Sequence, residues 1–266
     1  MTAVRVLIPV GLGLNCEDET AAAFRMVGAE VDLVHLTDLF AHRHPRRLAD
    51  YQVLALVGGF SYGDHVAGGL VLATRLRAHL RQDLSDLLAG GGRVLGICNG
   101  FQTLTRLGLL PGPGAGPADF VPRAALTDND RLGYRDAWVR VGVDRRCTSP
   151  WTRGVSTLEL PSRHGEGKFV LESAEALDRL EHRGQVAFRY LDATGKPTEA
   201  WPENPSGSPR GVAGVTDASG QILGLMPHPD AFLYPWHHPD FARRRRQLEG
   251  QEPGGLALFR AGITAP

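Results

Sequence analysis

The stretch Val94-Leu95-Gly96-Ile97-Cys98-Asn99-Gly100-Phe101-Gln102 decides the fold of this chain. It begins as a short apolar run after three glycines, which predicts a buried strand. It then passes through a glycine–X–cysteine–X–glycine step into a segment with helical spacing that ends near Leu107. Glycines on both sides of a central cysteine are typical of a sharp strand-to-helix turn that presents a nucleophile.

Cys98 is therefore a candidate nucleophile. The helix that follows it would stabilise negative charge on its sulfur through the N-terminal N–H groups. A buried structural cysteine after a core strand is the alternative interpretation, because free cysteines are often buried. The other two cysteines, Cys16 and Cys147, lie outside such a turn, and we predict that both are dispensable for the chemistry.

The rest of the chain predicts an α/β fold. Strands and helices alternate in the first half, with strands expected at 4–10, 30–36 and 51–57 and helices at 17–27 and 69–88. This alternation favours a mostly parallel, doubly wound sheet with helices on both faces. After a proline- and glycine-rich connector at 111–117, the spacing predicts a mixed or antiparallel addition to that sheet, with strands at 119–125, 137–143, 157–160, 168–171, 185–190, 211–216 and 221–226 and a helix at 173–180.

Length and composition fit a single domain. The chain has 266 residues, of which 42% are hydrophobic and 22% charged, and its 29 basic residues balance 29 acidic ones. This balance gives no electrostatic argument for nucleic-acid or membrane binding. Three cysteines suit a reducing compartment, and no apolar run approaches the ~20 residues of a membrane span, so we expect a cytoplasmic protein. We interpret residues 1–266 as one domain with a core of about 4–230 and a C-terminal extension of about 231–266.

A glycine-rich loop, Gly58 to Asp64, follows the third predicted strand. In a doubly wound sheet the loops at the carboxyl ends of the strands form the ligand crevice, so this loop and the Cys98 turn should open onto the same edge. Paired glycines leave backbone N–H groups free to bind an oxyanion. An ordinary glycine-rich turn is the alternative.

A histidine and an acid, His228 and Asp230, follow the last predicted strand and alternate with prolines. Activating a thiol for acyl transfer requires a base to take its proton and a carboxylate to orient that base. Cys98, His228 and Asp230 together therefore predict a catalytic triad, although the last two residues alone also fit a surface turn. The arginine run 243–246 is interpreted as a solvated helix face, with a contact for a phosphorylated ligand or an acidic partner as the alternative. We expect no metal ligands, because no spacing of cysteines or histidines predicts a metal site.

These motifs resemble those of the class I (triad) glutamine amidotransferases. The finer motifs are similar to those of the glutaminase subunits of phosphoribosylformylglycinamidine synthase, and the resemblance covers about Val4 to Asp230. It rests on Gly58-Gly-Phe-Ser-Tyr-Gly-Asp64, Gly96-Ile-Cys-Asn-Gly-Phe-Gln102, His164-Gly-Glu-Gly167, Asn204-Pro-Ser-Gly-Ser208 and Met226-Pro-His-Pro229.

The resemblance assigns roles to individual residues. It implies that Cys98 attacks the amide of glutamine, that His228 shuttles the proton and that Asp230 orients His228. The backbone N–H groups of Gly59 and Asn99 would bind the oxyanion. Glutamine would be bound by Gln102, Gly58, Phe60 and His164. The family's acid is usually glutamate, so the shorter Asp230 must approach His228 more closely or accept a longer contact.

The resemblance also implies the overall reaction. The chain would hydrolyse glutamine through a cysteine thioester and deliver ammonia to a synthetase subunit, which converts formylglycinamide ribonucleotide to the amidine in de novo purine synthesis. It would carry no cofactor itself, since ATP and magnesium would be used by that partner, and a small accessory subunit is a further expected partner. The alternatives are an amidotransferase subunit of another pathway and a non-catalytic regulatory or scaffolding subunit with the same fold.

Overall fold

A single nine-stranded sheet runs through the protein in a computed structural model that describes residues 3–264. The strand order is β2-β1-β3-β4-β11-β10-β9-β6-β7, and a separate two-stranded sheet pairs β5 with β8. The strand bounds are β1 Arg5–Val10, β2 Glu30–His35, β3 Val53–Leu56, β4 Arg93–Ile97, β5 Ala124–Thr127, β6 Arg135–Val143, β7 Thr157–His164, β8 Lys168–Leu171, β9 Val186–Tyr190, β10 Val212–Thr216 and β11 Ile222–Leu225.

The two halves of the sheet differ in strand direction. The pairs β1–β2, β1–β3, β3–β4 and β4–β11 are parallel, whereas β11–β10, β10–β9, β9–β6 and β6–β7 are antiparallel. Every residue of β3, β4 and β11 is buried, which explains why their sequences are apolar without alternation. The predicted parallel sheet with an antiparallel addition is confirmed.

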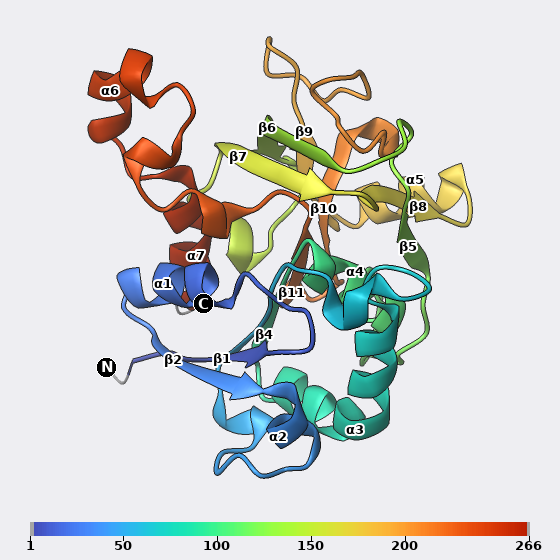
Figure 1. The fold of residues 1–266 in the computed structure, drawn as a ribbon. Helices are drawn as coiled ribbons and strands as arrows, with labels where there is room; N and C mark the ends of the chain where they lie inside the picture. The colour runs from blue at the N-terminus through green and yellow to red at the C-terminus, as the bar shows by residue number, and fades with distance from the viewer. Residues whose placement is uncertain (1–2, 265–266) are drawn as a thin grey trace.

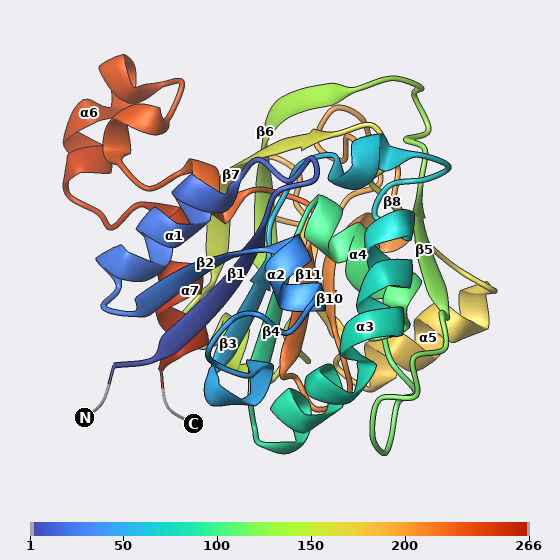
Figure 2. The same cartoon turned by 60° about the horizontal axis from the view of Figure 1, so that its bottom comes forward.

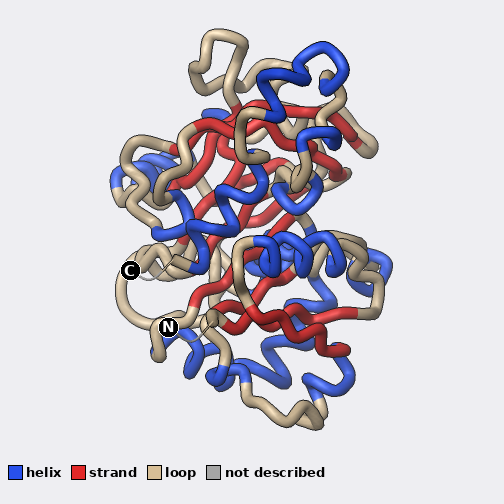
Figure 3. The backbone as a smooth tube through the Cα atoms, turned by 90° about the vertical axis from the view of Figure 1, so that its left-hand side faces the viewer, coloured by secondary structure: helices blue, strands red, loops and turns tan. Residues whose placement is uncertain are grey.

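Helices cover both faces of the sheet, outside the strands that run through the middle of the molecule (Figures 1, 2 and 3). Helices α1 and α7 pack together on one face, and α3 packs with α4 on the other, where α4 contacts β3 and β4. The helix bounds are α1 Glu17–Met26, α2 Leu36–Phe40, α3 Leu70–Ala89, α4 Asn99–Leu107, α5 Ala174–His182, α6 Phe241–Glu249 and α7 Gly254–Ile263, with short 3₁₀ helices at Leu48–Asp50, Ser61–Asp64, Pro150–Thr152, Pro209–Gly211, Pro229–Ala231 and Pro235–His237.

The segment after residue 230 contributes to the core through α7. Phe259 of this helix is fully buried and packs edge-to-face on Phe24 of α1, with the ring centroids 4.9 Å apart. The buried Arg93 donates hydrogen bonds to the carbonyl oxygens of Gly262 (2.7 Å) and Thr264 (2.8 Å). The C-terminal end of α7 is therefore fixed to the start of the central strand β4.

The arginine run lies on α6, which projects away from the body of the protein (Figure 1). Arg243 pairs with Asp240, Arg244 with Glu159 at 2.8 Å, and Arg245 with Glu249 at 3.0 Å. The solvated helix face predicted from the sequence is confirmed, and local acids neutralise much of its charge.

One predicted strand is wrong in its first part. The sequence predicts a strand over 119–125, whereas β5 spans Ala124–Thr127. The carboxylate of Asp119 accepts hydrogen bonds from the Val121 N–H and the Arg123 guanidinium, and Phe120 has a φ of +61°. These local bonds turn the chain, so residues 119–123 cannot extend.

The carboxyl ends of β1, β3, β4 and β11 meet at one edge of the sheet, because these strands are parallel neighbours. The loops that leave these ends carry the chemically interesting side chains described next. Within residues 3–264, no helix combines the length and apolar character that crossing a membrane requires.

Candidate active site

Cys98 occupies the turn between β4 and α4 in a strained conformation. Its φ of +51° and ψ of −105° are uncommon for a residue with a side chain. A Cβ on Gly100 would collide with the backbone carbonyl of Leu56, so the close approach of the turn to β3 requires glycine there. The Cys98 side chain is buried, and its thiol lies 3.4 Å from the carbonyl oxygen of Arg163. The predicted strand–cysteine–helix turn is confirmed.

His228 and Asp230 follow β11 and lie at the same edge. Nδ1 of His228 is 3.2 Å from Oδ1 of Asp230, an ion-pair distance, although the direction of approach is not that of a hydrogen bond. Both side chains are almost completely buried. Burial lowers the pKa of His228, but the negative charges of Asp230 and Cys98 outweigh it and raise the pKa well above its ordinary value. The shorter aspartate therefore still reaches the imidazole.

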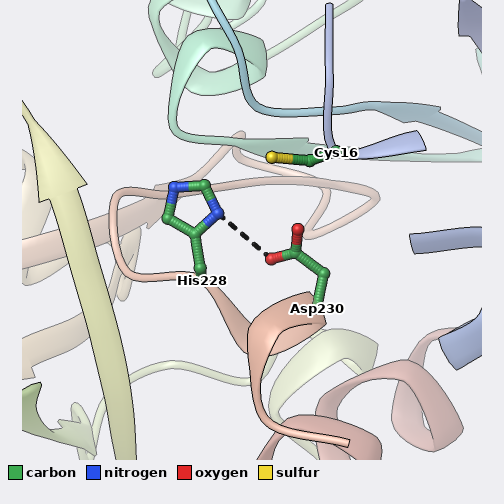
Figure 4. Close-up of side chains that lie close together, drawn as sticks. All are labelled: Cys16, His228 and Asp230. Carbon is green, nitrogen blue, oxygen red and sulfur yellow. Dashed lines mark ion pairs between the residues drawn. The ribbon is translucent and has the colours of Figure 1, made fainter. Parts of the chain in front are cut away.

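Cys16 is a site residue that the sequence does not reveal. It precedes α1, and its sulfur points toward the imidazole of His228 (Figure 4). Ligand atoms of Cys16, His228 and Asp230 all lie within 4.8 Å of one another. Burial raises the pKa of the Cys16 thiol. Cys16 therefore lies beside two of the candidate catalytic side chains, whereas its dispensability for the chemistry stays a prediction.

Topology supplies a signal that leads to Cys16. It follows the Gly11–Gly13 turn at the carboxyl end of β1, which is one of the parallel strands that meet at the site. Gly58, which follows β3, leaves room for the side chains of Cys16 and His228 to approach each other. A Cβ at Gly58 would lie 2.7 Å from Cε1 of His228 and 3.0 Å from Sγ of Cys16.

Asn99 fixes the glycine-rich loop to the Cys98 turn. Its side-chain oxygen accepts a hydrogen bond from the Ser61 N–H (3.2 Å), and its Nδ2 donates to Asp64 (2.8 Å) and to Oε1 of Gln102 (2.9 Å). Its backbone N–H opens α4, where N–H groups have no acceptor within the helix. Gly59 lines the same cavity as Cys98, with a φ of +132° that only glycine adopts readily.

A cavity of about 230 Å³ contains these groups. Nε2 of Gln102 donates to the carbonyl oxygen of Glu166 (2.7 Å), so the Gln102 amide is held by residues on both sides of the cavity. Phe60 is 47% exposed and lies near Tyr134, with 6.2 Å between ring centroids. The cavity is lined by Asn15, Cys16, Gly59, Phe60, Asp64, Cys98, Gln102, Tyr134, Arg163, His164, Gly165, Glu166 and His228.

His164 reaches the cavity with its ring already engaged. Nδ1 lies 2.9 Å from Oδ1 of Asn129, and Nε2 lies 2.9 Å from the hydroxyl of Ser162. The side chain is buried, and this burial, with the nearby charge of His228, lowers its pKa to about 4. A neutral imidazole bonded at both nitrogens shapes the wall of the cavity.

Comparisons with known proteins all identify glutamine amidotransferases as similar to this chain. The family model of the CobB/CobQ-like glutamine amidotransferase domain matches residues 3–264. The phosphoribosylformylglycinamidine synthase subunit PurQ of Methanococcus maripaludis is 37% identical over 243 residues, 91% of this chain and 87% of that protein. PurQ of Dehalococcoides mccartyi is 38% identical over 259 residues, 97% of this chain and 96% of that protein. In the structure of PurLQS from Thermotoga maritima, one chain has a TM-score of 0.71 and 25% identity, with 98% of each chain covered.

Proposed function

The chain belongs to the CobB/CobQ-like glutamine amidotransferase domain family and, within it, to the PurQ subunits of phosphoribosylformylglycinamidine synthase, and from this premise we propose how its residues perform the reaction. The chain is the glutaminase subunit of that synthase in purine biosynthesis. We propose Cys98 as nucleophile, His228 as base and Asp230 as orienting acid. The observation that carries this assignment is the meeting of all three at one sheet edge, with 3.2 Å between His228 and Asp230.

In the first step, His228 takes the proton of the Cys98 thiol, and the resulting thiolate attacks the side-chain amide carbon of glutamine. The backbone N–H groups of Gly59 and Asn99 bind the oxyanion that forms. His228 then gives the proton to the leaving nitrogen, ammonia departs and a glutamyl thioester remains on Cys98. Asp230 keeps its negative charge throughout and stabilises the imidazolium.

In the second step, His228 takes a proton from water, which attacks the thioester, and glutamate leaves as the thiol is restored. Gln102, Gly58, Phe60 and His164 are proposed to form the glutamine pocket, Gly58 by leaving room for His228 and His164 by shaping the wall. The charges that line the cavity also match an amino acid. We propose that the carboxylates of Asp64 and Glu166, two residues that line the cavity, bind the ammonium group of glutamine.

The ammonia is passed to a synthetase subunit, which uses it to convert formylglycinamide ribonucleotide to the amidine, with a small accessory subunit in the complex. PurLQS of Thermotoga maritima is the assembly to which this proposal corresponds. We propose that ATP and magnesium act on the synthetase, that no cofactor resides on this chain, that residues 1–266 act as one amidotransferase domain, and that the protein is cytoplasmic.

The test uses the assembled synthase with Cys98→Ala in this subunit. Glutamine-dependent synthesis should fall to background, whereas synthesis supplied with ammonium salts should continue, because the synthetase chemistry does not need the thiol. Cys147→Ser is the matched control, since Cys147 is a half-buried thiol outside the cavity. Continued use of glutamine by the Cys98→Ala complex would contradict the assignment of the nucleophile.

A further inference from the structure

Three buried polar atoms at the active site make no hydrogen bond within the described residues. Nδ1 of His228 and Oδ1 of Asp230 face each other as an ion pair at 3.2 Å, yet neither of these atoms makes a hydrogen bond in the described part of the chain, and neither does Nε2 of His228, although both residues are at least 97% buried. An unsatisfied buried polar group costs about 1–3 kcal/mol, so native proteins rarely leave several together without a bound species that contacts them. Once His228 is deprotonated, one of its nitrogens and the Asp230 oxygen can both donate electron pairs to a bound species.

Cys16 adds a third donor from a distant part of the sequence. Its sulfur, a ring nitrogen of His228 and a carboxylate oxygen of Asp230 lie within 4.8 Å of one another, and the sulfur points toward the ring (Figure 4). Sulfur, imidazole and carboxylate are the donors that Zn²⁺ prefers, and three protein ligands with one open position are typical of zinc sites that stay accessible to water or substrate. Tetrahedral Zn²⁺ places its ligand atoms about 3.3–3.7 Å apart. The longest distance between the three ligand atoms must therefore shorten by only about 1 Å when the ion binds.

The surroundings leave space for an ion. The cavity of about 230 Å³ is lined by Cys16 and His228, and it supplies room for a water or a substrate atom as the fourth ligand. Gly58 permits the close approach, because a Cβ there would meet both Cys16 and His228. No sequence spacing predicts this set, since its members come from the ends of β1 and β11.

We propose that Cys16, His228 and Asp230 form an inhibitory site for Zn²⁺ or a similar thiophilic divalent cation. The Cys16 thiol and Nδ1 of His228, the nitrogen that faces Asp230, lose their protons to solvent, and the ion takes the electron pairs of the sulfur and of Nδ1. A neutral imidazole bound in this way carries its proton on Nε2 and cannot accept another from the Cys98 thiol. This inhibition rests on the proposed role of His228 as base, whereas binding of the ion does not.

Binding is tested on the purified chain with Co²⁺, whose bond to a thiolate gives a sulfur-to-metal charge-transfer absorption band. The band should appear with a one-to-one stoichiometry in the wild type, in Cys147→Ser and in Cys98→Ala. It should be lost, or require roughly tenfold more Co²⁺ at least, in Cys16→Ser. A band that survives in Cys16→Ser and disappears in Cys98→Ala would place the ion on the nucleophile and overturn the proposal, as would the absence of any band in the wild type.

Inhibition is tested with Zn²⁺ on the assembled synthase, each variant being compared with its own metal-free rate. Glutamine-dependent synthesis by the wild type and by Cys147→Ser should fall at least tenfold at saturating Zn²⁺, while ammonia-dependent synthesis continues. Cys16→Ser should resist the same Zn²⁺ concentration. A cobalt band without inhibition would support the site and contradict the role of His228 as base, so the two proposals fail separately.

Discussion

Asp230→Asn is the perturbation whose effect follows most directly from the geometry. Asparagine keeps the shape of the buried side chain but removes the charge that faces His228. Two unit charges 3.2 Å apart attract by about 5 kcal/mol at an effective dielectric constant of about 20. If that attraction stabilises the imidazolium in the transition state, glutamine turnover should fall by about 10³–10⁴-fold, the scale known for the loss of an orienting acid in related triads.

The assay is a single-turnover measurement of glutamate formation, with ammonia-dependent synthesis by the same complex as the control for folding and assembly. A second readout is the pKa of His228 by NMR titration. Burial lowers this pKa and the charges of Asp230 and Cys98 raise it by more, so removing the carboxylate should lower it. Turnover within tenfold of the wild type, together with an unchanged His228 pKa, would refute the role assigned to Asp230.

Three further predictions concern single residues. Gly58→Ala should lower glutamine turnover about 100-fold with little change in thermal midpoint, because its Cβ would lie 2.7 Å from Cε1 of His228 and displace that ring; equal turnover would contradict the packing. His164 has a pKa of about 4 in the folded chain, below its ordinary value. Between about pH 6.5 and pH 4 the unfolded chain therefore binds a proton that the native state does not, and the free energy of unfolding decreases as the pH is lowered through this range. Urea unfolding should therefore show that, when the pH is lowered from 7 to 5, the free energy of unfolding of His164→Asn decreases by about 2 kcal/mol less than that of the wild type. Equal decreases would contradict a neutral buried His164. Arg93→Met should lower the free energy of unfolding by about 3 kcal/mol, because two carbonyl oxygens near the end of α7 lose a charged donor, and a loss below about 1 kcal/mol would show that this contact is dispensable.

The parallel part of the fold is predictable because its strands are covered on both faces. Strands β3, β4 and β11 are buried along their whole length, and apart from Arg93 at the start of β4 their residues are apolar or glycine, so continuous apolar runs identify them. The Cys98 turn is predictable for a similar reason, since glycine at position 100 is the residue that fits against Leu56. Strong local constraints therefore leave a clear trace in the sequence.

Contacts between distant segments leave no such trace. The carbonyl oxygen of Glu166 accepts a hydrogen bond from Gln102 of α4, and its carboxylate accepts one from the Gly68 N–H, so a helix and two loops that are distant in sequence meet at the cavity. The sequence identifies the motif His164-Gly-Glu-Gly167 without identifying these partners. Cys16 is missed for the same reason. Its neighbour His228 follows β11, which is the last strand in the sequence and is far from Cys16 along the chain.

Covalent trapping tests whether Cys98 carries the glutamyl group during the reaction. The purified complex is mixed with glutamine, quenched in acid within one turnover, digested and examined by mass spectrometry. We expect a glutamyl adduct on the peptide that contains Cys98, at a level that falls sharply in Asp230→Asn. An adduct on Cys16 instead, or consumption of glutamine with Cys98 unmodified at every time point, would contradict it.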